Sequence, residues 1–429
     1  MQTNKTDNLM LQSSQTNGKP LQDQMPLHVI TGWKRWLLML RVRAHLFRLA
    51  VGACGSVVRA IKTLRKVQQI KQTINGSKQL RRSIEINNRS YFGLYIPSFP
   101  SAAFDSFIHK ELNRIQPFHQ YKSTLQIVQL AVTSACPLHC EHCFEWNNLR
   151  KKDPFNAGEL KKLMYQFIDD GCSIIHFTGG EPMVKLPLLM ELLKNAPAAC
   201  EYWILTSGWG LNEESATALK KAGLTGAVIS LDHYNREKHN QFRGSEHAFD
   251  DAINAAIAAR KAGLVTAFSV CVTKTMANTY DLMNYAELAK QCGVAFVQLL
   301  EPKAVGHYQD QPVQLLPKQL QLLEQFYLKM NFDPQYKTYP LFMYHGFHQR
   351  RIGCQSAGKR ILYIDSAGFI DACPFCQTRT VHAGNILNGT LAIEQISIEG
   401  CPAYSKQNNK EAYKERSFKK NHYEKEIHV

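Results

Sequence analysis

Three cysteines set close together have the residue type and spacing for metal chemistry. In the segment Thr-Ser-Ala-Cys-Pro-Leu-His-Cys-Glu-His-Cys-Phe, directly after the apolar run 127–132, they are Cys136, Cys140 and Cys143. Three thiolates are one short of saturating a four-iron cube, so one iron would keep an open position. A structural zinc site normally takes four protein ligands in pairs, and no fourth cysteine lies close by. His139 and His142 lie in the same loop and are expected to be solvated rather than ligands.

This CxxxCxxC pattern, followed by the aromatic Phe144, resembles the signature of the radical S-adenosylmethionine (SAM) superfamily. The resemblance implies a [4Fe-4S] cluster on the three thiolates, with SAM chelated by the fourth iron. Reductive cleavage of SAM then yields methionine and a 5′-deoxyadenosyl radical, which takes a hydrogen atom from the substrate. The resemblance also implies an external electron donor of the flavodoxin or ferredoxin type, and it places Phe144 beside the adenine. It assigns no catalytic acid, base or protein radical.

A second loop resembles the GGEP motif of that family, which contacts the SAM amino group. Gly179 and Gly180 allow close approach of the backbone to a ligand. Glu181 offers an acceptor for an ammonium group. The nearby Thr206-Ser-Gly resembles a TNG motif, although a simple turn explains it equally well.

A third loop contains Ser230-Leu-Asp232 and ends in His-Asn-Gln-Phe-Arg243-Gly. Ser230 and Asp232 can hold ribose hydroxyls, and Arg243 can pair bidentately with the SAM carboxylate. Relatives often carry a similar pattern at this point. The alternative for Arg243 is a structural ion pair within the loop.

A second group of cysteines lies near the end of the chain. Cys354 precedes a hairpin pattern with a turn at Gly368, which leads to Cys373 and Cys376, and Cys401 follows at a distance. The pattern resembles the SPASM or twitch extension of radical SAM enzymes, which implies an auxiliary [4Fe-4S] cluster on these four cysteines. A structural zinc site made of the same thiolates is the alternative. The five single cysteines are expected to be small buried hydrophobic residues: Cys54, Cys172, Cys200, Cys271 and Cys292.

From residue 125 onward, strand-like and helix-like patterns alternate, which predicts an α/β fold with a parallel sheet. Six β-α units indicate a partial (β/α)6 TIM-like barrel, with an N-terminal helical extension and a small C-terminal Cys-rich domain. In such barrels the chemistry lies on loops after the strands. The predicted strands are 127–132, 173–177, 202–205, 226–230, 265–273 and 295–299.

The net charge of +16 is concentrated near the N-terminus. Between Asp23 and Glu85 there are thirteen basic residues and no acidic one, among apolar residues at helical spacing. This predicts one or two basic amphipathic helices, broken near Gly52 and Gly55. They either pack on the main domain or bind an anionic membrane surface through residues 29–84. No segment is long and charge-free enough to span a bilayer, and nucleic acid is a poor fit because few aromatics interleave the basic residues.

These patterns divide the chain into six parts. Residues 1–28 are expected to be disordered, 29–120 to form the basic helical extension and a connector, and 121–305 to form the radical SAM core. Residues 306–350 are a less regular bridge, 351–402 the auxiliary cluster domain, and 403–429 a polar tail.

The resulting hypothesis is a cytoplasmic enzyme, either free or peripheral on a membrane, that abstracts hydrogen from a peptide, a protein or a small molecule. Twelve cysteines without a visible signal peptide favour a reducing compartment. A membrane-surface enzyme acting on a lipid or lipid-linked substrate is one alternative. A non-catalytic iron–sulfur scaffold is the other.

Overall fold

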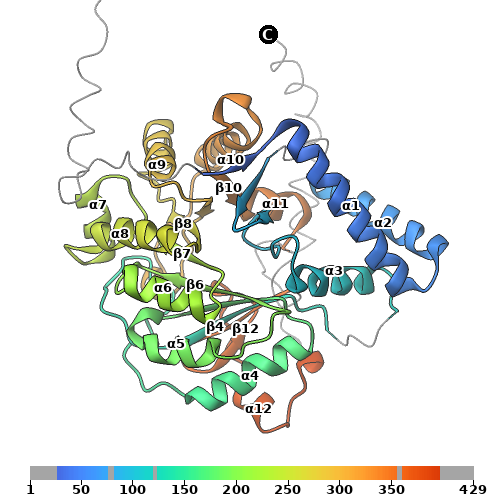
Figure 1. Cartoon of the computed structure of the whole chain (residues 1–429). Coiled ribbons are helices and arrows are strands. Elements are labelled where there is room, and N and C mark those ends of the chain that lie inside the picture. Colours follow the sequence, from blue (N-terminus) through green and yellow to red (C-terminus); the bar gives the residue numbers. More distant parts are fainter. Residues whose placement is uncertain (1–26, 76–81, 119–122, 355–359, 397–429) are drawn as a thin grey trace, which may run out of the picture.

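The computed structural model describes residues 27–75, 82–118, 123–354 and 360–396 (Figure 1). Residues 1–26 of the segment predicted to be disordered, the tail 403–429 and Cys401 lie outside these ranges.

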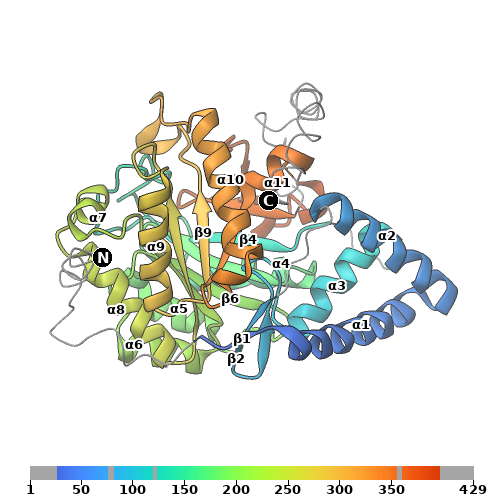
Figure 2. The same ribbon diagram turned by 90° about the horizontal axis from the view of Figure 1, so that it is seen from above.

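Six parallel strands form the centre of one large sheet, as the sequence predicts. They are β4 (Ile127–Thr133), β5 (Ile174–Gly179), β6 (Glu201–Thr206), β7 (Gly226–Ser230), β8 (Val265–Cys271) and β9 (Phe296–Leu300). The helices between them are α4 (Ala157–Asp169), α5 (Leu186–Leu193), α6 (Glu213–Ala222), α7 (Arg236–Arg243), α8 (Ala248–Lys261) and α9 (Thr279–Gln291), with a short 3₁₀ turn, η3 (Pro182–Lys185), before α5. Figure 2 shows the helices around the strands. The two end strands of the sheet do not pair with each other among the described residues, so the barrel is partial.

Local sequence explains why several of these helices begin where they do. The Asn156 side chain accepts from the backbone of Glu159, whose carboxylate accepts in return, and this capping box begins α4. Asn212 and Ser215 make the same arrangement at α6. Helices cover the outer face of the sheet, and most strand residues are apolar and buried, which accounts for the long apolar runs in the sequence.

The sheet extends further on both sides than the six predicted units. Beyond β9, the bridge 306–350 contains η4 (Gly306–Tyr308), α10 (Pro317–Phe332), η5 (Pro334–Tyr336), β10 (Leu341–Tyr344) and α11 (His345–Ile352). Strand β10 pairs in parallel with β9, so the expectation of a less regular bridge is wrong. A four-residue apolar run does not distinguish a strand from a buried helical turn, which is why the pattern missed it.

On the other side, the Cys-rich C-terminal unit joins the same sheet. Strand β11 (Ile361–Ile364) runs parallel to β4 and turns at Gly368 into β12 (Phe369–Asp371), the predicted hairpin. Strand β13 (Val381–His382), α12 (Gly384–Leu387) and η6 (Ile393–Gln395) follow. The unit is therefore continuous with the barrel through hydrogen bonds between strands.

The N-terminal end of the barrel is closed by the connector, which contains strands that the sequence did not predict. Strand β1 (Val29–Ile30) pairs with β2 (Ser83–Ile86), and β2 pairs with β3 (Arg89–Tyr91). Ile84 of β2, Tyr91 of β3 and Leu94, just after β3, pack against the first inward-facing residues of the barrel strands. This apolar floor excludes water from the end of the barrel opposite the strand-end loops.

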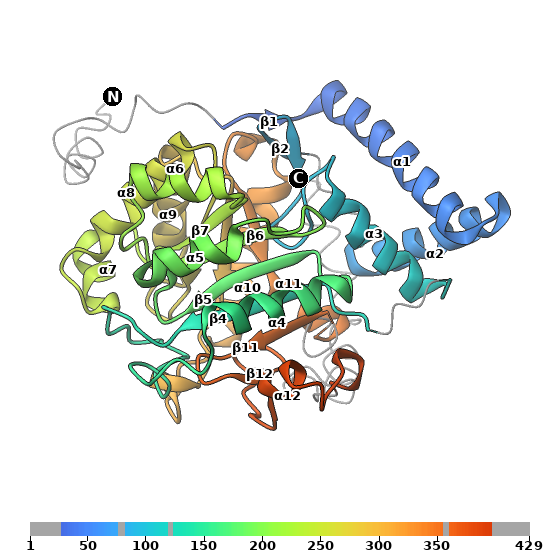
Figure 3. The ribbon, with the colours of Figure 1, turned by 60° about the horizontal axis from the view of Figure 1, so that its bottom comes forward.

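The predicted basic helices are α1 (Gly32–Cys54) and α2 (Val57–Asn75). They are separated at Gly55, which takes a left-handed conformation with φ 63°. Both pack on α3 (Ala102–Ile115) and lie at the edge of the molecule (Figures 1 and 3). No helix in the described part of the chain is long and apolar enough to cross a membrane.

Candidate active site

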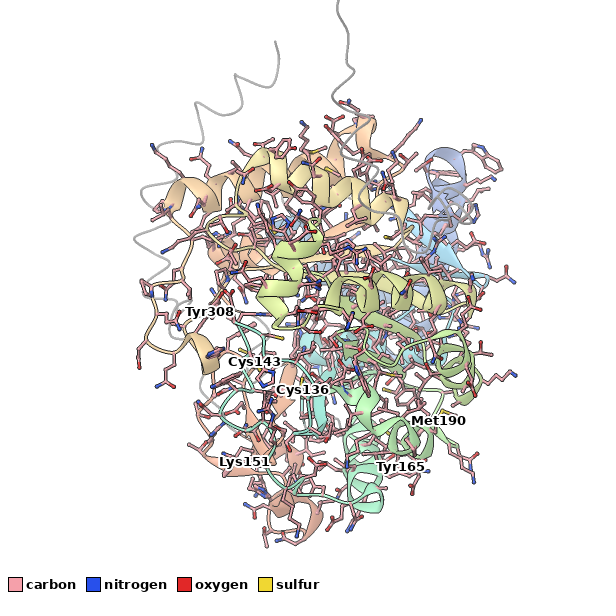
Figure 4. All side chains as sticks on the ribbon, turned by 90° about the vertical axis from the view of Figure 1, so that its left-hand side faces the viewer. Cys136, Cys143, Lys151, Tyr165, Met190 and Tyr308 are labelled. Atoms are coloured by element: carbon pink, nitrogen blue, oxygen red, sulfur yellow. The ribbon has the colours of Figure 1, made fainter. Side chains whose placement is uncertain are left out.

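The three cysteines of the first group surround one cavity. Cys136, Cys140 and Cys143 lie on the loop that follows β4, called here the cysteine loop (residues 134–150), and line a cavity of about 620 Å³. Figure 4 shows Cys136 and Cys143 near each other, and Tyr308, also labelled there, lines the same cavity. Burial raises the pKa of Cys136 and of Cys143 to about 12, and it also raises the pKa of Cys140. Thiols in such a place ionise only beside a strong positive charge, which an iron centre would supply.

The loop after β5 holds the start of the cysteine loop. The backbone N–H groups of Gly180 and Glu181 donate to the carbonyls of Thr133 and Ala135, at 2.7 and 2.8 Å. A Cβ on Gly180 would lie 2.2 Å from the Ala135 carbonyl oxygen, and one on Gly179 would lie 2.2 Å from that of Thr133. Both glycines are therefore required for backbone packing, before any ligand is considered.

Glu181 joins this loop to the next one. Its carboxylate accepts hydrogen bonds from the Thr206 hydroxyl at 2.7 Å and from the Ser207 backbone and hydroxyl at 2.7 and 2.6 Å. The Met183 N–H donates at 3.1 Å. Burial raises the pKa of Glu181, and the bonds from Ser207 and Thr206 oppose that rise. The carboxylate is thus already well supplied with donors, and the Thr-Ser-Gly turn orients it.

Helix α7 supports the middle of the cysteine loop. Its last two carbonyls, those of Phe242 and Arg243, accept from the N–H groups of Glu141 and His139 at 3.0 and 3.2 Å. Gly244 (φ 63°) lies so close that a Cβ would be 2.8 Å from the His139 carbonyl oxygen. Arg243 and Gly244 therefore hold the backbone of the cysteine loop at His139, the first by a hydrogen bond and the second by close packing.

The Arg243 side chain forms a buried ion pair. Its Nε and Nη2 lie 2.6 and 2.5 Å from Asp232 Oδ2, and its Nη1 lies 3.6 Å from the Cys140 sulfur. The Cys271 N–H donates to the other Asp232 oxygen at 2.8 Å. Burial alone would raise the Asp232 pKa, but Arg243, with help from His142 and His239, holds it below its usual range. The structural ion pair is thus present, while contact of Asp232 or Arg243 with SAM stays a prediction.

The end of the cysteine loop is held by the segment after β9. His307 donates from its backbone to the Cys143 carbonyl at 2.9 Å and stacks its ring on Trp146 at 3.8 Å. Its Nδ1 lies 2.9 Å from the Cys140 carbonyl oxygen. A Cβ on Gly306 would lie 2.2 Å from the Cys143 carbonyl oxygen. No motif in the sequence marked these residues, because their role depends on contacts across the barrel mouth.

The second group of cysteines faces the same cavity. Cys354, Cys373 and Cys376 line it together with the first three, and the Phe144 ring makes an edge contact with Phe375 at 6.0 Å between centroids. Among the described residues, no three His, Cys, Asp or Glu side chains converge on a point where they could hold a single metal ion.

A buried polar network connects the two cysteine groups. The Glu145 carboxylate accepts from the hydroxyls of Tyr363 and Ser366, and Asn148 donates to Asp365 at 2.9 Å. Burial raises the pKa of Glu145, and the bonds from Ser366 and Tyr363 oppose that rise. Gln377 also donates to the Phe144 carbonyl at 3.1 Å. The cysteine loop and the C-terminal unit therefore hold each other in place.

Deeper in the cavity, the wall becomes polar just above the apolar floor. Both ring nitrogens of His176, on β5, are buried without a hydrogen-bond partner, as is Oε1 of the adjacent Gln129 on β4. Gln298 donates to the Tyr95 hydroxyl at 2.5 Å across the barrel. Burial lowers the pKa of His176 to about 4, so the ring is neutral at pH 7. His176 lies three residues before the GGEP segment, on the same strand. Since side chains alternate between the two faces of a strand, its position along β5 could have predicted that it points into the barrel.

The remaining predicted residues are placed as follows. Phe144, Gly179, Gly180, Glu181 and Ser230 all line the cavity, and their contacts with SAM stay predictions. The five single cysteines are buried, and Cys271 also lines the cavity wall.

Comparison with known proteins relates part of the chain to one protein family. Residues 130–286 match the radical SAM superfamily. The chain is 35% identical over 121 residues to GTP 3′,8-cyclase of Chlorobaculum tepidum, covering 28% of this chain and 36% of that protein. It is 27% identical over 171 residues to AdoMet-dependent heme synthase of Nitratidesulfovibrio vulgaris, covering 40% and 46%. The chain thus spans less than half the length of these two relatives.

Among solved structures, the fold is similar to that of Streptococcus suis SuiB bound to its precursor peptide SuiA. The TM-score is 0.52 at 14% identity, over 82% of this chain and 80% of SuiB. At that identity the similarity concerns the fold alone. It covers far more of the chain than residues 130–286, which match the family.

Substituting Gly180→Ala should displace the cysteine loop, because the new Cβ overlaps the Ala135 carbonyl. We expect the free energy of unfolding of the metal-free chain to fall by about 2 kcal/mol, as for other overpacked sites, and iron binding after reconstitution to fall below half. Urea denaturation and iron analysis measure the two effects. Gly52→Ala is the control, since nothing lies within 4 Å of its Cβ position. Wild-type stability and iron content in Gly180→Ala would refute the packing argument.

Stability should decrease at mildly acidic pH because His176 is buried in its neutral form. Its pKa is about 4 in the folded chain against 6.5 ordinarily, so its contribution is complete above about pH 6.5 and is lost as the pH falls toward 4. When the pH is lowered from about 7.5 to about 5, the free energy of unfolding of wild type should fall by about 2 kcal/mol more than that of His176→Gln. The other histidines contribute equally to both proteins and cancel in this comparison. Urea denaturation at both pH values measures this difference. Parallel pH profiles would show that His176 is not buried as a neutral ring.

Proposed function

We propose that this chain, whose residues 130–286 form a radical SAM domain, cleaves SAM reductively and abstracts a hydrogen atom from a substrate held in the barrel cavity. The observation that carries the proposal is that one cavity of about 620 Å³ is lined by Cys136, Cys140 and Cys143 together with Glu181 and Asp232. These residues come from three separate loops, and a metal site alone would not require that convergence.

The residues present fit the cofactors that the family uses. Three thiols of raised pKa, one buried (Cys140) and two half-buried, need a cationic partner to ionise, and three thiolates leave one iron of a [4Fe-4S] cluster open for SAM. When bound, the cluster supplies the electron that splits SAM into methionine and a 5′-deoxyadenosyl radical. An external donor of the flavodoxin or ferredoxin type would supply that electron to the protein.

The protein's own residues position and shield these groups. Arg243 places a fixed positive charge 3.6 Å from the Cys140 sulfur, which favours the thiolate, while Asp232 neutralises the rest of that charge. The Thr206–Ser207 turn fixes the Glu181 carboxylate at the cavity wall, where an incoming ammonium group would compete for the Ser207 hydroxyl bond. The apolar floor excludes water from the end of the barrel opposite these loops.

The second cysteine group is proposed to hold an auxiliary [4Fe-4S] cluster on Cys354, Cys373 and Cys376, with Cys401 as the fourth candidate ligand. Support comes from their position on the same cavity and from the Phe144–Phe375 contact between the two groups. In this position the auxiliary cluster would either bind the substrate or pass electrons.

The proposed substrate class is a peptide or protein. SuiB, which shares the fold over 82% of this chain, was solved with a precursor peptide. The inner wall offers unpaired hydrogen-bonding groups on Gln129 and His176, which suits the amide or polar side chain of a peptide. A small-molecule substrate would use the same wall.

Anaerobic reconstitution tests this function directly. Wild type should bind about eight irons per chain, as two four-iron clusters require, and should form 5′-deoxyadenosine from SAM when reduced with dithionite. Cys140→Ala should retain about four irons and should form no 5′-deoxyadenosine, because only the first cluster is lost. Chromatography of the quenched reaction and iron analysis measure both.

Cys373→Ala is the matched control, because it should also lose about four irons while still forming 5′-deoxyadenosine. Reconstituted wild type that forms no 5′-deoxyadenosine would favour a non-catalytic scaffold. Zinc without iron at the second group would favour the structural alternative there.

A further inference from the structure

Large exposed hydrophobic side chains gather on the N-terminal helices. In the described part of the chain, eight of the twelve lie on α1 and the first turns of α2. Trp33 and Trp36 are 68% and 61% exposed, and Val58 is 62% exposed. The other five are Leu37, Leu40, Phe47, Val57 and Ile61. A concentration of large exposed apolar side chains on one pair of helices is typical of an interaction site.

The packing of α1 on the protein does not account for these residues. Its inward face already buries Leu38 and Val42 against Phe99 and Phe104. The outward stripe follows the separate helical spacing 33, 36, 40 and 47, on the opposite side of the helix. Helix α1 therefore has two apolar faces, and folding uses only one.

Basic side chains border the outward stripe. Arg41, Arg43 and Arg48 on α1 are exposed beside it, and Arg59, Lys62, Arg65 and Lys66 continue the charge along α2. None of these seven residues forms an ion pair within the described structure, and no acidic residue occurs between Asp23 and Glu85. The surface thus combines exposed tryptophans with unneutralised positive charge.

We infer that the outward face of α1 and the start of α2 docks on an anionic phospholipid bilayer, with Trp33, Trp36 and Phe47 inserted at the headgroup level. Tryptophan favours that level, and flanking arginines bind acidic headgroups. Helix α1 is not long and apolar enough to cross a membrane, so it would lie in the plane of the membrane surface.

This placement leaves the catalytic machinery free. Helix α3 packs against both α1 and α2, and the cysteine loop lies on the barrel, away from the outward face (Figures 1 and 3). The inference is therefore independent of the proposed reaction, and their failures are distinguishable.

Vesicle co-sedimentation of the full-length reconstituted protein tests the inference. Wild type should sediment with phosphatidylcholine vesicles containing about one-quarter phosphatidylglycerol, but not with phosphatidylcholine alone, and high salt should weaken binding. The triple variant Trp33→Ser/Trp36→Ser/Phe47→Ser should bind at least about tenfold more weakly. Arg41→Gln/Arg43→Gln should weaken binding and reduce its salt dependence.

Tyr280→Ser is the matched control, since it removes an exposed aromatic ring from α9, far along the chain from these helices. The free energy of unfolding measured in urea should be close to that of wild type in every variant, which shows that the fold is intact. Equal binding by wild type and the triple variant would overturn the inference, as would no binding to anionic vesicles at low salt. So would a dimer in solution that only the triple variant dissociates, because the face would then bind a second copy.

Discussion

The backbone of the cysteine loop lies in direct contact with three glycines from three different strand-end loops. A Cβ at Gly180, Gly244 or Gly306 would lie between 2.2 and 2.8 Å from a carbonyl oxygen of Ala135, His139 or Cys143, respectively. Each contact is accompanied by backbone hydrogen bonds to the same stretch. Because these loops follow β5, β7 and β9, the positions of the three sulfurs depend on the geometry of the whole barrel rather than on the loop itself.

Buried charge is arranged around that loop so that little of it is unpaired. Asp232 and Arg243 neutralise each other while Arg243 reaches the Cys140 sulfur, and Glu181 is satisfied by hydroxyl and backbone donors. Glu145 links the far end of the loop to the C-terminal unit. In a low-dielectric interior each of these groups would be costly alone, so the network also fixes the relative position of the two cysteine groups.

The sequence predicted the parts of this arrangement that are local. The three cysteines, the glycine loop after β5 and the six parallel strands follow from spacing and periodicity, and the basic helices broken at Gly55 follow from charge and turn chemistry. What it missed is non-local. The strand β10 was too short to identify, the β2–β3 floor depends on packing against distant strands, and Gly306 and His307 matter only through contacts across the barrel mouth. Arg243 lies between these two cases. The sequence identified it as a site residue, but only the structure shows that Asp232 is its ion-pair partner.

The central claim is that Cys136, Cys140 and Cys143 hold a cluster with one iron open to SAM. Electron–nuclear double resonance on the reduced protein, with SAM isotopically labelled at its amino or carboxylate group, tests this most directly. A variant with Cys354, Cys373 and Cys376 changed to alanine removes the second signal. The account predicts hyperfine coupling from both labelled groups to the remaining cluster. A reduced cluster whose spectrum shows coupling to neither group would contradict it.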